Sequence, residues 1–107
     1  MDDKIKKLLL KGIKIGISKN HLTKEQVNAI MEKDWRLVDL SYIRENRYLI
    51  AFDGTCFDYQ NGCIMKRYKD NKIYGLQSRG NCNKSVRVVT LLCDCFCDFD
   101  GDLETLF

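Results

Sequence analysis

Several features that would place this 107-residue chain in a familiar class are missing from it. It has no proline and only one histidine. No apolar run reaches the roughly 18 residues of a membrane-spanning helix, and the N-terminus lacks the basic flank and apolar stretch of a signal peptide. With 45% hydrophobic and 31% charged residues, the composition excludes a disordered or collagen-like protein. We therefore expect a small soluble domain spanning residues 1–107, located in the cytoplasm.

Motifs of the common enzyme classes are also missing. The sequence has no phosphate-binding loop, dinucleotide-binding fingerprint, nucleophile elbow or zinc-protease motif. His21 could act as a base beside a cysteine or a serine, but it stands just before a helix-start signal. We therefore expect His21 to be an exposed residue at a helix entry. The sequence predicts a protein that is not an enzyme and that needs no cofactor.

The first third of the chain has helical signals. Apolar residues from Ile5 onward recur near helical spacing and predict a helix over about 3–11, while Gly12 and Gly16 leave 13–17 open between helix and strand. Thr23 and Gln26 form a capping box, which predicts a second helix ending near Asp34.

From Trp35 onward the pattern favours β-structure. Short runs rich in β-branched and aromatic residues alternate with turn signals, of which Asn61-Gly62 is the strongest and predicts a type I′ hairpin. The expected strands are 36–43, 47–53, 56–60, 63–69, 72–78 and 86–97. Short connections favour an antiparallel arrangement. The predicted fold class is α+β, with two N-terminal helices (1–34) packed on an antiparallel meander of about five to six strands (35–107).

The six cysteines have spacings that do not favour a metal site. No C-x-x-C pair is present. In an extended C-x-C the side chains lie about 7 Å apart, whereas thiolates on one zinc ion lie roughly 3.8 Å apart. On the predicted strand 86–97, Cys93, Cys95 and Cys97 share an apolar face, so we expect buried, free thiols. A metal site built from Cys56, Cys63, Cys82 and the 93–97 cluster is a third-ranked hypothesis.

Charge divides the chain into two parts. Residues 1–92 have 18 basic and 10 acidic side chains, whereas the last 15 residues have five acidic side chains and no basic one. A basic body can attract nucleic acid or an acidic protein face. The acidic end, with Asp100 and Asp102, is expected to form a second contact with a partner.

Basic and aromatic residues interleave along the predicted sheet, with lysines such as Lys69 and Lys72 between them. An exposed sheet face rich in tyrosine and arginine has the composition of a protein-interface hot spot, but it can also hold single-stranded nucleic acid. The residues expected to contact a partner are Arg47, Tyr48, Arg67, Tyr68, Tyr74, Arg79 and Arg87.

Two functions from different classes follow from this surface. The first is a small binding or inhibitory protein that acts through protein–protein contacts. Twelve lysines, nine isoleucines and only two alanines indicate an AT-rich genome, which is compatible with a phage or mobile-element inhibitor of a nucleic-acid-processing enzyme, similar in role to an anti-CRISPR protein. The alternative is an RNA-binding protein or endoribonuclease toxin that acts through Arg47, Arg67, Tyr68, Arg79 and Arg87.

Overall fold

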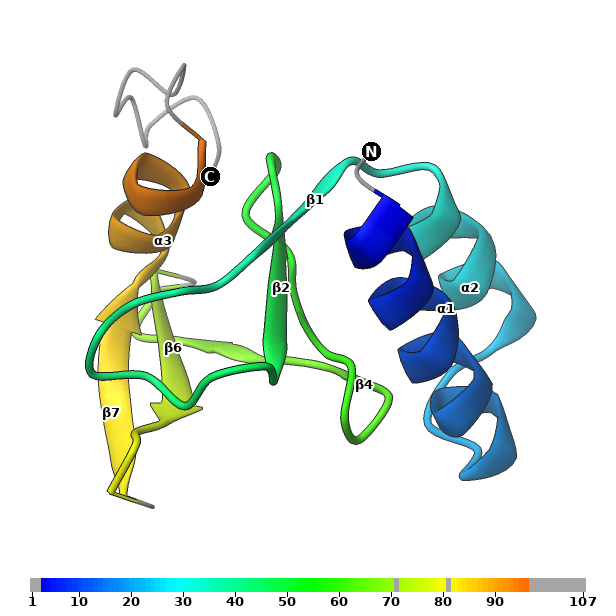
Figure 1. The fold of residues 1–107 in the computed structure, drawn as a ribbon, viewed down its shortest axis with the longest axis horizontal. Coiled ribbons are helices and arrows are strands. Elements are labelled where there is room, and N and C mark those ends of the chain that lie inside the picture. Colours follow the sequence, from blue (N-terminus) through cyan, green and yellow to red (C-terminus); the bar gives the residue numbers. More distant parts are fainter. Residues whose placement is uncertain (1–2, 71, 81, 97–107) are drawn as a thin grey trace.

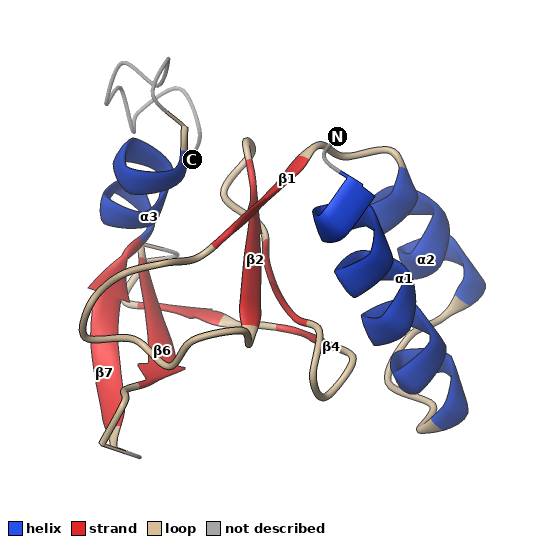
Figure 2. Ribbon diagram, viewed as in Figure 1, coloured by secondary structure: helices blue, strands red, loops and turns tan. Residues whose placement is uncertain are grey.

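The computed structural model describes residues 3–70, 72–80 and 82–96. These residues form three helices and two antiparallel sheets, which confirms the predicted α+β class. The elements lie within about 34 × 31 × 28 Å and are arranged in layers, with one sheet between the N-terminal helix pair and the remaining elements (Figures 1 and 2).

The two N-terminal helices are present as predicted. Helix α1 spans Asp3–Ser18 and therefore includes the segment that the sequence left open. Its Gly12 is buried against the sheet, where a Cβ atom would lie only 2.7 Å from the Cα atom of Tyr59. Helix α2 spans Lys24–Met31, slightly shorter than expected, and begins at the predicted capping box, in which Gln26 N donates to Thr23 Oγ1 at 3.2 Å.

The first sheet contains four strands in sequence order. They are β1 (Trp35–Leu37), β2 (Tyr48–Ala51), β3 (Cys56–Asp58) and β4 (Cys63–Ile64), and each is antiparallel to its neighbour. The expected hairpin at Asn61-Gly62 joins β3 to β4, but Gly62 alone of the two has a positive φ, of 71°. The turn is therefore not type I′, which requires a positive φ at both central residues.

The expected single meander is divided into two sheets. The predicted strand 63–69 is divided: β4 ends at Ile64, and the next strand begins at Arg67. Between them, Met65 N donates to Cys56 O of the first sheet at 2.9 Å. A second antiparallel sheet follows, with strands β5 (Arg67–Tyr68), β6 (Ile73–Gln77) and β7 (Asn83–Arg87) in sequence order. An isolated bridge pairs Ile43, in the β1–β2 connection, with Ser78, directly after β6.

The prediction of a strand over 86–97 is wrong for its larger part. Strand β7 ends at Arg87, and helix α3 spans Val88–Cys95. Apolar residues run almost without interruption from Val88 to Leu92, so the pattern fits a buried strand and a buried helix equally well. The helix places Val88, Leu91 and Leu92 in the core, while Cys93 lies exposed.

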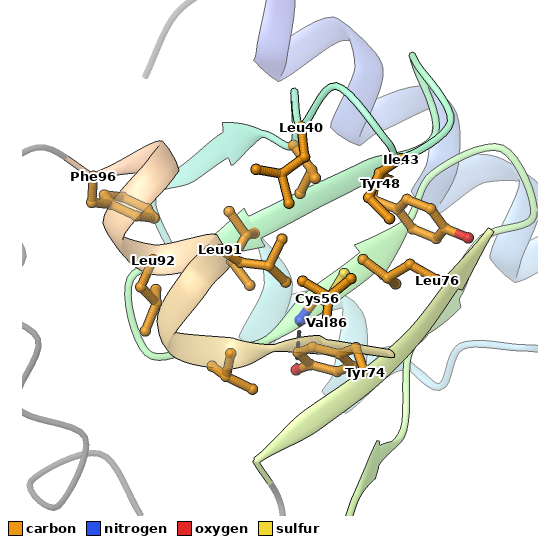
Figure 3. Packing of buried hydrophobic residues seen from close by; sticks show 13 residues of the cluster. Leu40, Ile43, Tyr48, Cys56, Tyr74, Leu76, Val86, Leu91, Leu92 and Phe96 are labelled. Carbon is orange, nitrogen blue, oxygen red and sulfur yellow. Dashed lines mark hydrogen bonds between the residues drawn. The ribbon is translucent and has the colours of Figure 1, made fainter. Parts of the chain in front are cut away.

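The core consists of two clusters on opposite faces of the first sheet. Helices α1 and α2 cover one face, where Trp35, Leu49 and Phe57 are fully buried. The second sheet and α3 cover the other face, where Tyr48 and Ile50 belong to the cluster shown in Figure 3. Because both faces are covered, all four residues of β2 are buried. In the described part of the chain, no helix is both long and apolar enough to cross a membrane.

Candidate binding surface

The residues predicted to contact a partner do not share one face. In the structure, Arg47, Tyr48, Arg67 and Tyr74 participate in packing between the two sheets, whereas Tyr68, Arg79 and Arg87 lie exposed. Asp100 and Asp102 lie outside the described residues. The sequence pattern therefore did not separate the residues that pack between the sheets from those that lie on the surface.

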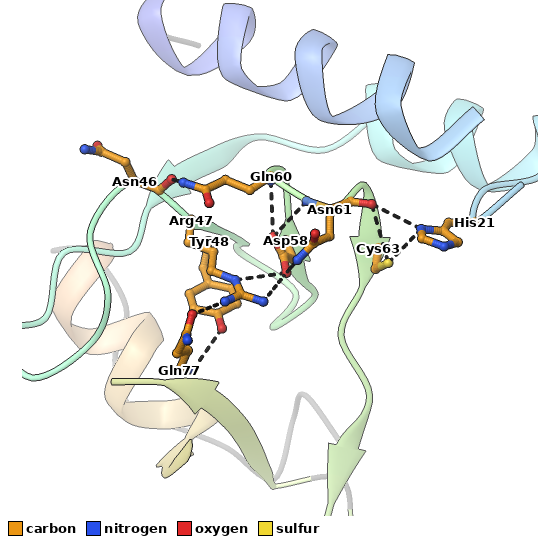
Figure 4. Close-up of polar contacts among 9 residues, drawn as sticks. All are labelled: His21, Asn46, Arg47, Tyr48, Asp58, Gln60, Asn61, Cys63 and Gln77. Carbon is orange, nitrogen blue, oxygen red and sulfur yellow. Dashed lines mark hydrogen bonds and ion pairs between the residues drawn. The ribbon is translucent and has the colours of Figure 1, made fainter. Parts of the chain in front are cut away.

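Tyr48 and Arg47 belong to a polar network that connects the sheets (Figure 4). Tyr48 is only 1% exposed, and its hydroxyl accepts a hydrogen bond from Gln77 N at 2.9 Å. Arg47 forms an ion pair with the buried Asp58 at 3.0 Å and donates to the Gln77 side chain. Burial raises the pKa of Tyr48, although the bond from Gln77 and the charge of Arg47 act in the opposite direction. These contacts give both residues a structural role.

Tyr74 and Arg67 form a second such connection, of which Figure 3 shows Tyr74 and its hydrogen bond from Cys56 N. The Tyr74 hydroxyl donates to Gly54 O at 2.5 Å and accepts from Cys56 N at 3.1 Å and from Arg67 Nε at 3.0 Å. The side chain is 1% exposed, and burial raises its pKa despite the bond from Arg67. Tyr74 therefore fixes the second sheet against the turn between β2 and β3.

The opposite face of the second sheet carries a different set of residues. Tyr68 pairs with Ile73, and Ile73 pairs with Arg87, so the three side chains form one row across β5, β6 and β7. Since Tyr74 and Val86 point into the core, their neighbours in the alternating pattern point outward. Tyr68 is 58% exposed. We call Tyr68, Ile73 and Arg87 the outward row.

A basic hollow adjoins the outward row. It has a volume of about 420 Å³ and is lined by Lys69, Lys72, Ile73 and Arg87. The β5–β6 turn presents the two lysines: Lys69 has a left-handed backbone with φ of 51°, and Lys72 N donates to Tyr68 O at 3.2 Å. The turn is tied to the start of α3, because Val88 N donates to Lys72 O at 2.9 Å.

Several basic side chains outside the basic hollow form ion pairs. Arg47 pairs with Asp58, Arg79 with Glu45, and Lys33 with Asp53. By contrast, the side chains of Lys69, Lys72 and Arg87 have no ion-pair partner within residues 3–70, 72–80 and 82–96. Three positively charged side chains around one concavity can attract an anionic group. Arg79, one of the predicted contact residues, is exposed but already paired.

The cysteines are scattered rather than clustered. Cys56 is buried, and burial raises its thiol pKa, as expected for a structural thiol. Burial and the charge of Asp94 raise the pKa of Cys95 to about 12. Cys93 is exposed, which corrects the expectation that it shares a buried face with Cys95 and Cys97; Cys97 itself lies outside the described residues. Cys82 is also exposed. Among the residues that the structure places, no three His, Cys, Asp or Glu side chains gather to hold a metal ion.

His21 has a neighbour that the sequence did not reveal. It is exposed, as expected, but its Nδ1 lies 3.0 Å from Cys63 Sγ and 3.1 Å from Asn61 O (Figure 4). Burial and the charge of Asp58 raise the pKa of Cys63, against the opposing charges of Lys19 and Arg47. A nucleophilic cysteine acts as the thiolate, so a raised pKa does not favour catalysis. The pair instead connects the helix α1–α2 loop to the β3–β4 turn.

None of the protein-family models, curated proteins or solved structures compared with this chain matches it. The surface therefore has to be interpreted from its own geometry. The sequence analysis identified Tyr68 and Arg87 but not Ile73, which is part of the outward row and of the basic hollow. Only the register of the strands shows that these three residues are neighbours, and the register of a hairpin is fixed by its turn, here the β5–β6 turn.

Proposed function

We propose that this chain is a non-enzymatic binding protein that acts through protein–protein contacts, with the outward row as the centre of its contact surface. The observation that carries the proposal is the cross-strand alignment of Tyr68, Ile73 and Arg87 on a face that the rest of the described chain leaves uncovered. Aromatic and arginine side chains are enriched at the centres of protein interfaces, where they contribute most of the binding energy.

The burial of tyrosines favours a protein partner over single-stranded RNA. Sheets that bind RNA stack successive bases on several exposed rings. Strands β5, β6 and β7 contain two tyrosines, of which Tyr74 is only 1% exposed, so Tyr68 is the one that they present outward. One ring can anchor a protein contact, but it does not form a stacking platform for a strand.

The charge of the surface indicates the character of the partner. The edge of the contact face carries three basic residues, Lys69, Lys72 and Arg87. The described residues form no ion pair with them. An acidic patch beside an apolar pocket on the partner would complement this face. We extend the proposal to an inhibitory role: the partner is a nucleic-acid-processing enzyme, and the protein is a phage or mobile-element product. The small size and the AT-rich composition support this extension.

Site-specific cross-linking tests the contact surface. A photoreactive phenylalanine analogue is placed at position 68 or, as a matched control, at position 42, because Tyr42 is a comparably exposed tyrosine (42%) outside the outward row. We expect position 68, but not position 42, to form a covalent adduct with one protein from host cells. The purified partner should then form a stoichiometric complex that Tyr68→Ala weakens. Equal cross-linking at both positions, or none at 68, would contradict the proposal.

A further inference from the structure

The basic hollow has a specific chemistry beyond that of a general contact surface. We propose that it is a binding site for the phosphate monoester of a small ligand, of about the size of a mononucleotide. The inference uses the same three cations as the proposed contact face, Lys69, Lys72 and Arg87, but makes no use of Tyr68, so the two proposals can be tested separately.

The number of cations fits phosphate better than carboxylate. A phosphate monoester carries a charge of about −1.5 to −2 at neutral pH and has three strong acceptor oxygens. A carboxylate carries only one negative charge and would leave more of the positive charge of the three basic side chains unneutralised. Arg87 can bind two phosphate oxygens at once, whereas Lys69 and Lys72 act as point charges.

The surroundings favour an anion at this place. The cations of the hollow have no acidic partner among the described residues, so an incoming phosphate has no ion pair to displace. Arg87 is also the N-cap of α3 and makes no side-chain capping hydrogen bond.

The size and lining of the hollow indicate an organic phosphate. Its volume of about 420 Å³ lies within the range of small-ligand pockets, roughly 300–1,000 Å³, and exceeds what a phosphate ion alone would fill. Ile73 supplies an apolar wall between Lys72 and Arg87. The phosphate would contact the cations while the remainder of the ligand lies against Ile73.

The site is held by backbone contacts as well as by side chains. Lys72 is fixed at both backbone groups, because its N–H donates to Tyr68 O at 3.2 Å and its carbonyl accepts from Val88 N at 2.9 Å. Lys69 and Asp70 both adopt left-handed backbone conformations, with φ of 51° and 61°. Such conformations cost free energy and are concentrated at ligand sites.

A titration followed by amide NMR tests the proposal. The full-length reduced protein is titrated with inorganic phosphate and, separately, with adenosine monophosphate at constant ionic strength. We expect saturable shifts of the Lys69, Lys72, Ile73 and Arg87 amides with both probes, and tighter binding of the nucleotide. Lys72→Gln combined with Arg87→Gln should weaken binding by about tenfold or more, because two charge-assisted contacts are removed.

The controls separate a site from general charge attraction and from misfolding. Lys84→Gln removes an exposed lysine of β7 that does not line the hollow, and it should leave the affinity within about twofold. The thermal midpoint of each variant shows whether it is folded; if the double variant unfolds, Lys72→Gln alone replaces it. Shifts that never saturate, or an equal loss in Lys84→Gln, would overturn the proposal. Because Tyr68→Ala leaves all lining residues in place, phosphate binding and the protein contact can fail independently.

Discussion

The two faces of the β5–β7 sheet contain similar residues in very different surroundings. On the inward face, Tyr74 is 1% exposed and its hydroxyl makes three hydrogen bonds, one of them with Arg67. On the outward face, Tyr68 is 58% exposed and lies in a row with Arg87. A tyrosine and an arginine thus hold the sheets together on one side and are available to a partner on the other. Residue type does not decide between these roles; strand register does.

Tyrosine removal should show the largest difference between the two faces. Tyr74→Ala leaves a cavity between the sheets and leaves Cys56 N without its acceptor, so we expect a loss of about 3–5 kcal/mol in the free energy of unfolding. Tyr68→Ala should change it by no more than about 0.5 kcal/mol. Urea denaturation measures both values. Similar losses in the two variants would show that the outward row also holds the fold.

Ion pairs should show a smaller difference of the same kind. Asp58 is 4% exposed at its side chain and accepts hydrogen bonds from Arg47, Gln60 and Asn61. Asp58→Asn turns an amide group towards these donors, and we expect a loss of about 2–3 kcal/mol in the free energy of unfolding, since Arg47 remains partly solvated. Arg79→Gln, which removes the exposed pair with Glu45, should cost less than about 1 kcal/mol. A greater loss for Arg79→Gln would contradict the assignment of structural roles.

The smallest expected effect concerns Asp53 and depends on pH. Partial burial raises the pKa of Asp53, but hydrogen bonds from Lys33 and Thr55 outweigh it, so that the pKa is lowered on folding. A lowered pKa contributes stability above the unfolded-state value of about 3.9 and loses it as pH falls through the folded-state value. Because the pair is half-exposed, we expect Asp53→Asn to cost less than about 1 kcal/mol at pH 7. The difference from the unsubstituted protein should vanish in acid; a difference that grows there would have the wrong sign.

Local signals in the sequence predicted the N-terminal half well. The capping box at Thr23 and Gln26 is a short-range interaction, and the structure contains both of its hydrogen bonds. Short runs of β-branched and aromatic residues between turn signals predicted strands at the places of β2 and β3. The strand expected over 36–43 was too long, because the structure has a strand only over Trp35–Leu37. Helix α1 extends past Gly12, which packs closely against Tyr59. Because Tyr59 lies far away in the sequence, no local signal could show this contact. Tertiary contact here overrides the low helix propensity of glycine.

The C-terminal part depended on information that no short segment contains. The apolar run from Val88 fits both periodicities, and only packing against the first sheet makes it a helix. The candidate site also could not be read from one segment, because Tyr68, Ile73 and Arg87 become neighbours only through pairing across three strands. The contact between His21 and Cys63 joins residues 42 positions apart. Composition identified the residue types of the surface, and three-dimensional register selected which of them are available.

The most direct measurement is a titration with nucleic acid, because the central claim is that the outward row contacts a protein. Labelled single-stranded RNA and duplex DNA are titrated with the reduced protein at about 50 and 200 mM salt, a range over which phosphate contacts weaken strongly. We predict only weak binding that disappears at the higher salt and that Tyr68→Ala leaves unchanged. Tight binding that persists at the higher salt and is reduced by Tyr68→Ala would contradict the account and make the sheet an RNA-binding surface.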